Sequence, residues 1–121
     1  LRKIIHGDPL EFTSGTQNYD FIYISDVAKA FRLIAERGHS NKGYLIGSGE
    51  AKPLRSFVGD IIDELKPTQK PLFGNVPYTG VMTPIETYQI TDLKNDCGFR
   101  PSIPFKKGVR MTFEWLKGVE K

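Results

Sequence analysis

The chain has 121 residues, a formal net charge of +3 at pH 7, and a composition that is 39% hydrophobic and 26% charged. This is the size and composition of one domain with a buried core, and no apolar run approaches the roughly 18 residues of a membrane span. The basic residues are spread among acidic ones, which argues against a nucleic-acid partner and suits a small anionic ligand. The single cysteine, Cys97, excludes a disulfide within the chain and fits a reducing, cytoplasmic compartment.

The first part of the chain predicts a helix end, two strands and a second helix. LRKIIHG is typical of the last turns of a helix that stops at Gly7. PLEFTSGTQNYDFIYI predicts a β-hairpin around Ser14 and Gly15, and its FIYI end is apolar on both faces, as in a strand covered on both sides. Ser25 is expected to cap the next helix, with Asp26 in its first turn, where the helix dipole favours a negative charge.

Helical periodicity then recurs along the chain. The helix after Ser25 is expected to end at Gly38 and to bury one apolar stripe, formed by Val27, Ala30, Phe31 and Ile34. The clearest pattern predicts a helix from Leu54 to Leu65, and further helices are expected over 91–98 and 105–119.

The intervening segments predict short strands and one long loop. GYLIGSG reads as a short buried strand that runs into a Gly-rich turn, and ETYQI as another short strand. Residues 67–84 hold four prolines, and this stretch is too long for a plain connector, so it is expected to be functional or to lie against a partner.

Motifs that carry chemistry on their own are missing from the sequence. It contains no P-loop, HExxH or CxxC, and none of its tyrosines is followed by lysine four positions later. We therefore expect no metal site, no cofactor-binding site and no catalytic residue in this chain. Asp20 and Asp26 flank FIYIS and could form a carboxylate pair, but stabilising a turn and a helix start explains them better. His6 and His39 fall at predicted helix ends, where solvated or capping roles are usual.

Three blocks of the sequence, in the right order, resemble one enzyme family. GTQNYDFIYISDVAKAF resembles the GxGxQxRDFxxVxDVAxA segment of the extended short-chain dehydrogenase/reductases, the nucleotide-sugar epimerases and dehydratases. GYLIGSGEAKPLRSFVGDII is similar to the YNIGSG strand, turn and helix of that family. TDLKNDCGFRPSIPFKKGVRMTFEWL is similar to its ending, in which D-x-x-K is followed by a G-[WF]-x-P motif.

The resemblance implies an α/β (α+β) fold with a small mixed sheet, a β-hairpin and three to four helices. It covers only the C-terminal part of the family's enzymes, so residues 1–121 are expected to be a substrate-binding domain without its Rossmann domain. In the full-length protein that missing N-terminal domain would bind NAD or NADP and carry the Tyr-x-x-x-Lys pair, and hydride would pass to and from a sugar carbon. This chain alone is expected to bind no cofactor.

The resemblance also implies a nucleotide-sugar site with substrate-binding residues Leu10, Phe12, Tyr19, Thr87 and Tyr88. Phe12 falls where the family packs the nucleotide base, although a core strand residue is an equally good interpretation. Tyr19 replaces the arginine that binds the diphosphate, and Thr87 and Tyr88 stand where a second arginine is common. A diphosphate favours charge-assisted donors, so either the pocket is rebuilt for another head group or the cations come from the missing domain.

Other functions remain open at this stage. A stand-alone module derived from the family could bind a small molecule or a protein, and a basic single-strand nucleic-acid binder is a weaker alternative. No nucleic-acid or membrane partner is expected. If the neighbouring domain is absent, the apolar FIYI and YLIG segments would be bare, and the chain is expected to self-associate or to leave part of 67–84 disordered.

Overall fold

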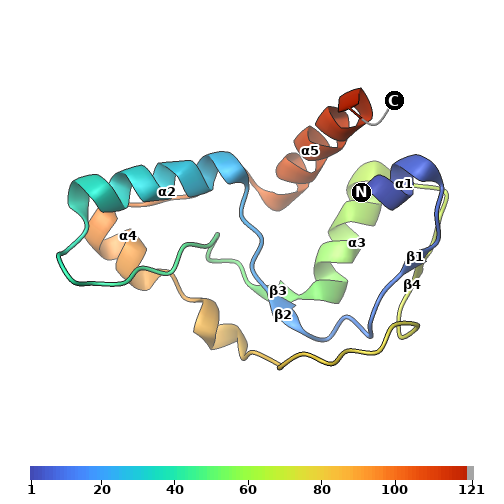
Figure 1. Ribbon diagram of the computed structural model, residues 1–121, viewed down its shortest axis with the longest axis horizontal. Coiled ribbons are helices and arrows are strands. Elements are labelled where there is room, and N and C mark those ends of the chain that lie inside the picture. Colours follow the sequence, from blue (N-terminus) through green and yellow to red (C-terminus); the bar gives the residue numbers. More distant parts are fainter. Residues whose placement is uncertain (120–121) are drawn as a thin grey trace. The chain divides into compact units, whose positions relative to one another are not determined.

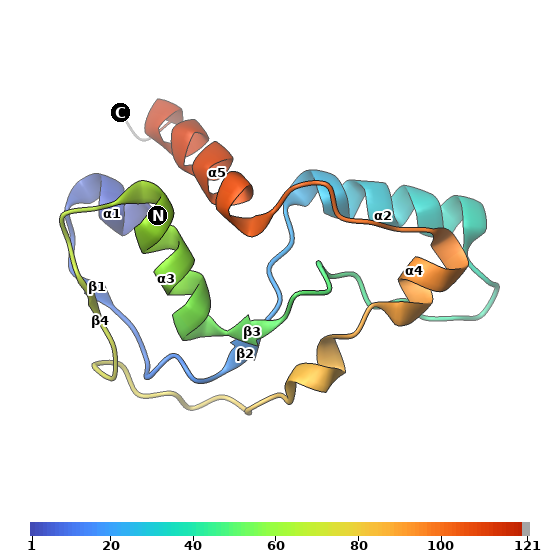
Figure 2. The same cartoon turned by 180° about the vertical axis from the view of Figure 1, so that it is seen from behind.

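A computed structural model describes residues 1–119, which form two compact units (Figures 1 and 2). Unit 1 comprises Leu1–Gln17, Pro53–Met82 and the described residues from Lys106 onward. Unit 2 comprises Asn18–Lys52 and Thr83–Phe105. Each unit is therefore assembled from segments that lie far apart in the sequence. Contacts between these segments decide which side chains each unit buries and which it exposes.

A two-stranded parallel sheet lies in unit 1, next to the first helix. Helix α1 (Arg2–His6) ends, as predicted, at Gly7, which has a φ of 76°. Strand β1 (Leu10–Glu11) pairs with β4 (Pro71–Leu72), and the two lie side by side in both views. The pairing continues past the strands, since the Phe12 backbone N–H donates to the Leu72 carbonyl at 2.9 Å. The expectation that 67–84 finds no partner in this chain is wrong for β4, because a late proline-bounded segment pairs with the start of the chain.

Two long helices complete unit 1. Helix α3 (Leu54–Leu65) has the predicted bounds and buries Phe57 and Val58. Helix α5 (Phe105–Val119) buries Val109 and Leu116. Arg110 of α5 holds the end of α3, since it donates to the Glu64 carboxylate at 2.6 Å and to the Glu64 carbonyl at 2.7 Å. No helix within residues 1–119 combines the length and the apolar content needed to cross a membrane.

The expected hairpin around Ser14 and Gly15 does not form. Strand β2 (Asn18–Tyr19) pairs with β3 (Lys52–Pro53), while β1 pairs with β4. FIYI is not a strand either, because helix α2 (Ile24–Arg37) already begins within it. The N-cap of α2 is Tyr23, without a side-chain hydrogen bond, so the prediction that Ser25 is the cap is wrong.

Unit 2 is built around the packing of α2 against α4 (Thr91–Cys97), which lie side by side (Figures 1 and 2). Helix α4 ends at Gly98, as predicted, with a φ of 68°. The buried core cluster contains Ala30, Leu33, Ile90, Leu93, Cys97 and Phe99. Cys97 is fully buried in this cluster, but the expected burial of Phe31 is wrong: that side chain is 63% exposed.

Both strands predicted around the core of unit 2 take other forms. GYLIGSG makes no sheet ladder, although Tyr44 and Ile46 pack against the core cluster. The first three residues of ETYQI instead belong to the 3-10 helix η1 (Ile85–Tyr88). A local pattern of apolar residues indicates that one face of a segment is buried. A β-strand also needs a partner strand to form its backbone hydrogen bonds, and neither segment has one.

A cluster of polar side chains ties the segment after α2 to α4. The ammonium of Lys42 lies 2.6 Å from the Asp96 carboxylate, and the Tyr44 hydroxyl donates to the same carboxylate oxygen at 2.8 Å. These two hydrogen bonds, from Lys42 first, hold the pKa of Asp96 below its ordinary value. The hydrogen bond to Asp96 raises the pKa of Lys42 in turn.

Candidate functional site

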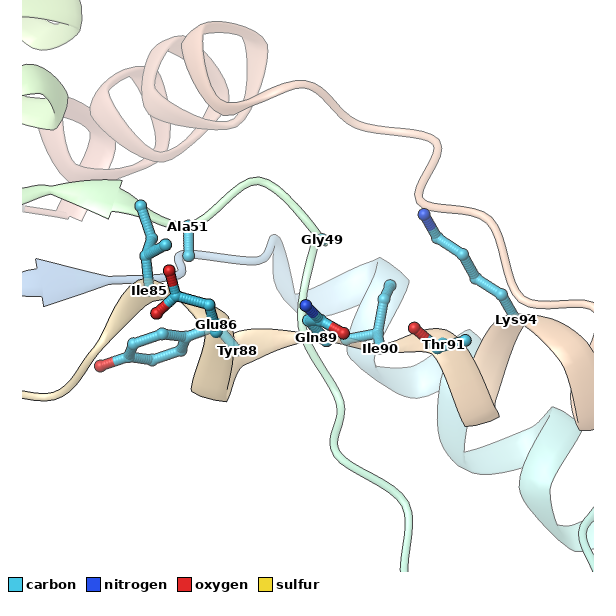
Figure 3. Close-up of a pocket in the computed structure, with 9 residues that line it drawn as sticks. All are labelled: Gly49, Ala51, Ile85, Glu86, Tyr88, Gln89, Ile90, Thr91 and Lys94. Atoms are coloured by element: carbon cyan, nitrogen blue, oxygen red, sulfur yellow. The ribbon is translucent and has the colours of Figure 1, made fainter.

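A pocket of about 290 Å³ in unit 2 is the candidate site (Figure 3). Residues after the Gly-rich turn form one part of its lining, and η1 with the start of α4 forms the rest. The lining residues are Gly49, Ala51, Ile85, Glu86, Tyr88, Gln89, Ile90, Thr91 and Lys94. Polar and charged groups alternate with apolar ones here, so the pocket offers both hydrogen-bond donors and acceptors to a ligand.

The Gly-rich turn is fixed in place by one carboxylate. Asp20 accepts a hydrogen bond from the Gly49 backbone N–H at 3.0 Å and another from the Ser48 hydroxyl. A Cβ at Gly47 would lie only 2.5 Å from an Asp20 oxygen, and Gly49 has a φ of +80°, so both positions need glycine. The prediction that Asp20 bonds turn backbone is confirmed, although the turn it holds is 28 residues away from it.

The floor of the pocket is anchored in the core of unit 2. Ile90 is buried in the core cluster and lies between η1 and α4. Its Cδ1 atom lies 3.3 Å from the position a Gly49 Cβ would take. This close approach sets the spacing between the Gly-rich turn and the segment that carries Tyr88, so the pocket has a fixed width at this level.

Tyr88 is held by the strand that carries Tyr19. Its hydroxyl donates to the Asn18 backbone carbonyl at 2.8 Å, and the Asn18 side-chain amide donates to the Thr83 carbonyl at 3.0 Å. These bonds join β2 to the segment that enters η1. The Tyr88 hydroxyl hydrogen is therefore already used, and only the oxygen lone pairs of this group remain for a ligand.

Lys94 and Glu86 are the charged residues in the lining. The Lys94 side chain rises from α4, and its ammonium lies 3.4 Å from the position a Gly49 Cβ would take (Figure 3). Among residues 1–119 Lys94 has no ion-pair partner, in contrast to Lys42, which is bound to Asp96. An ammonium at a pocket wall without a carboxylate partner is suited to an anionic ligand group.

The pocket offers neutral hydrogen-bonding groups as well as charged ones. Its hydroxyl and amide groups come from Tyr88, Gln89 and Thr91, and its lining contains no histidine or cysteine. Residues 1–119 hold no cluster of three or more histidine, cysteine, aspartate or glutamate side chains placed to ligate a metal ion. What the pocket can do is orient a ligand through one cation, one carboxylate and several neutral hydrogen-bonding groups.

The five residues expected to bind substrate fall in both units. Leu10 is buried in β1, and the ring of Phe12 stacks on Phe73 with centroids 5.6 Å apart, both in unit 1. Tyr19, Thr87 and Tyr88 lie in unit 2. Of these three, only Tyr88 lines the pocket; Thr87 is exposed on η1, and Tyr19 is 37% exposed and lies against Phe21.

Sequence reasoning missed Lys94, Glu86, Gln89 and Thr91 as lining residues. A signal for Lys94 was present, because it is the lysine of the D-x-x-K motif in TDLK. The motif does not show where that side chain points. Only the packing of α4 against the Gly-rich turn brings the ammonium to the pocket.

Comparison with known proteins agrees with the sequence motifs. Residues 1–47 match the model of the NAD dependent epimerase/dehydratase family. The dTDP-D-glucose 4,6-dehydratase of Homo sapiens is 26% identical over 121 residues, which cover 93% of this chain and 32% of that protein. The UDP-N-acetyl-alpha-D-glucosaminuronate decarboxylase of Bacillus cytotoxicus is 25% identical, over 99% of this chain and 39% of its own length.

Solved structures share the fold. A UDP-glucose 4-epimerase from Thermotoga maritima, solved with UDP-glucose, matches with a TM-score of 0.83 at 21% identity, over 98% of this chain and 38% of that one. The dTDP-glucose 4,6-dehydratase of Bacillus anthracis, solved with NAD, gives the same TM-score, identity and coverage. The chain thus spans about a third of the length of the proteins it matches.

The fold is therefore that of the epimerase and dehydratase class, which confirms the α/β (α+β) prediction. Within that class, the family match over residues 1–47 and the named relatives show that the chain resembles the NAD-dependent epimerases and dehydratases of the extended short-chain dehydrogenase/reductase family. The resemblance carried by the three sequence blocks is confirmed.

Proposed function

We propose that this chain is the substrate-binding part of an NAD(P)-dependent enzyme that acts on a nucleotide sugar. The observation that carries the proposal is a pocket with an unpaired ammonium, Lys94, in a chain of the epimerase and dehydratase family. A nucleotide sugar brings an anionic diphosphate and several sugar hydroxyls. Lys94 suits the first, while Glu86, Gln89, Thr91 and the Tyr88 oxygen suit the second.

The residues of this chain do not fit the dinucleotide cofactor. The turn GSG is its closest approach to a Gly-rich phosphate loop, but the Gly49 N–H is taken by Asp20 and the Glu50 N–H by the Ser48 hydroxyl at 3.1 Å. The Asp20 carboxylate at this turn would also repel a pyrophosphate. The cofactor and the general base therefore belong to the rest of the full-length enzyme, which we expect to be encoded upstream.

Tyr19 and Lys94 are the two candidates to replace the missing arginine as the diphosphate contact. Tyr19 can give a diphosphate only a neutral hydrogen bond, whereas Lys94 gives a charge-assisted one. We infer that the site is rebuilt, with its cation supplied from α4 instead of from β2. Phe12 stays a candidate contact for the nucleotide base, and Leu10 and Thr87 stay candidate substrate contacts.

The test is binding of UDP-glucose and dTDP-glucose to the chain and to the full-length enzyme, measured by isothermal titration calorimetry. Replacing Lys94 by glutamine should weaken binding about tenfold or more, since a charge-assisted bond is lost. Lys107→Gln is the matched control, because Lys107 is exposed in unit 1 and carries the same charge. Equal affinities in the two variants would contradict the role given to Lys94.

A second measurement addresses catalysis. With either sugar and added NAD, the 121-residue chain should show no change in absorbance at the wavelength of NADH, because it lacks the Tyr-x-x-x-Lys pair. The full-length enzyme should turn the substrate over. A module that works alone would instead bind the sugar tightly and have no coding sequence for a Rossmann domain upstream.

A further inference from the structure

An arginine in unit 1 lies over one ring of an aromatic pair. The guanidinium carbon of Arg55 lies 4.3 Å from the centroid of the Phe73 ring, and Phe73 is itself stacked on Phe12 at an interplanar angle of 29°. A guanidinium that lies over a ring keeps its N–H donors at its edge. Contact with the ring therefore restricts where the Arg55 guanidinium lies and leaves N–H donors available to a ligand.

The charge of Arg55 is not neutralised within its unit. Arg110, in the same unit, donates to the Glu64 carboxylate at 2.6 Å, whereas Arg55 has no carboxylate partner among residues 1–119. Its side chain is exposed at the start of α3. A fixed, solvent-accessible guanidinium without an acidic partner has the features of a binding site for phosphate or another oxyanion.

A cavity adjoins Arg55 and is lined by two hydroxyl groups. It has a volume of about 490 Å³, and its lining residues are Gly15, Thr16, Pro53, Arg55 and Ser56. Gly15 lies against α3 so closely that a Cβ there would lie 2.9 Å from the Arg55 Cβ. Glycine at this turn thus lets the segment that carries Thr16 approach the start of α3, and the Thr16 hydroxyl also shares a hydrogen bond with the Ser14 hydroxyl at 3.2 Å.

The first backbone amides of α3 are not the donors of this site. The Leu54 N–H donates to the Gln17 carbonyl at 2.8 Å, and the Arg55 N–H donates to the Gly15 carbonyl at 2.9 Å. The ligand-binding capacity therefore comes from side chains, with one planar cation and two hydroxyls around a cavity.

We propose that Arg55, Ser56 and Thr16 bind a phosphate group in this cavity. The site goes beyond the proposed function, because it lies in unit 1 and Lys94 lies in unit 2. The phosphate belongs either to the diphosphate of a nucleotide sugar or to a free phosphate compound. Either source offers the same chemistry, because each carries a tetrahedral oxyanion that can accept two parallel N–H bonds from one guanidinium.

The test is a titration of the 121-residue chain with inorganic pyrophosphate, followed by amide shifts of Gly15, Thr16 and Ser56. Arg55→Gln should raise the dissociation constant about tenfold or more, and Ser56→Ala about two- to tenfold. Arg55→Lys keeps the positive charge but loses the paired N–H donors of the guanidinium. Its dissociation constant for pyrophosphate should lie between those of Arg55→Gln and Ser56→Ala. Arg32→Gln removes the same charge from an exposed position in unit 2 and should change the constant less than twofold.

Thermal unfolding of each variant shows whether it is folded. If Arg55→Gln does not fold, the binding measurement on Ser56→Ala decides the test. The proposal would be overturned if Arg55→Gln and Arg32→Gln changed the dissociation constant equally. It would also be overturned if neither Arg55→Gln nor Ser56→Ala changed that constant. Competition with UDP-glucose identifies the source: displacement of pyrophosphate indicates the nucleotide diphosphate, and joint binding indicates a free phosphate. Failure of the Lys94 experiment leaves this result intact, whereas displacement of pyrophosphate by UDP-glucose would assign the diphosphate to Arg55 and contradict the role given to Lys94.

Discussion

Asp26, in the first turn of α2, is bonded to the backbone of Ser102. Its carboxylate accepts the Ser102 N–H at 3.0 Å and the Ile103 N–H at 2.9 Å, and the side chain is 2% exposed. The acid that the sequence assigns to a helix start thus fixes the link between α4 and α5. Because the carboxylate is buried, it depends on these N–H donors in place of water.

Replacing Asp26 by alanine should therefore lower the free energy of unfolding by about 1–3 kcal/mol, because two partly buried N–H groups lose a charged acceptor. Asp26→Asn keeps one acceptor oxygen and should lose about half as much. Urea unfolding measures both. Asp63→Ala is the control, since Asp63 has only a 3.8 Å surface contact with Lys106, and it should cost less than about 0.5 kcal/mol. Equal costs at both positions would show that the bonds of Asp26 add nothing.

The cluster around Asp96 should make stability depend on pH. The pKa of Asp96 is lowered in the folded chain, so its contribution is present above the ordinary value of 3.8 and is lost as the pH falls through the lower folded value. The pKa of Lys42 is raised, so its contribution is present below 10.5 and is lost as the pH rises through the higher folded value. In thermal melts from pH 2 to 6, Asp96→Asn should flatten the acid limb. If the fall in melting temperature at low pH is unchanged in Asp96→Asn, other carboxylates are responsible for it.

Gly47 should not tolerate a side chain. An alanine Cβ there would lie 2.5 Å from an Asp20 oxygen, so the Gly-rich turn or Asp20 must shift, at a cost of about 1–3 kcal/mol. Sugar-nucleotide binding should weaken with it, since that turn lines the pocket. Gly43→Ala is the matched control, because nothing lies within 4 Å of its Cβ position. Chemical unfolding and calorimetric titration of both variants give the comparison.

Tyr19 should matter for ligand binding more than for folding. Within residues 1–119 its hydroxyl makes no hydrogen bond, whereas that of Tyr88 donates to Asn18. Tyr19→Phe should therefore leave unfolding unchanged and cost about 0.5–1.5 kcal/mol of affinity for the nucleotide sugar. Tyr88→Phe should show the opposite bias, with a loss of stability. Unaltered affinity in Tyr19→Phe would assign that residue to packing against Phe21.

The isolated chain should self-associate through α2. Ile24 and Phe31 are 70% and 63% exposed, and their spacing of seven residues puts them on one face of the helix. Sedimentation velocity should show a mass that rises with concentration, and Phe31→Glu should return the chain to a monomer. Arg32→Gln changes the charge by the same amount beside it and should have no such effect. A wild-type monomer at high concentration would contradict the prediction.

The sequence by itself determined the helices, because their signals are local. The apolar period of 54–65 and the stops at Gly7 and Gly98 depend on residues within a few positions of one another. It also revealed the family resemblance, through three blocks whose order needs no coordinates.

Tertiary structure alone decided the strand partners, the exposed face of α2 and the contents of the pocket. A strand needs a partner that can lie anywhere in the chain, so β1 pairs with β4, 61 residues later in register, and not with its neighbour β2. ETYQI alternates like a strand but finds no ladder and becomes η1. Lys94 reaches the pocket only because α4 packs beside the Gly-rich turn. Local patterns fix the backbone over one or two turns of helix, whereas these three outcomes depend on which distant surfaces meet.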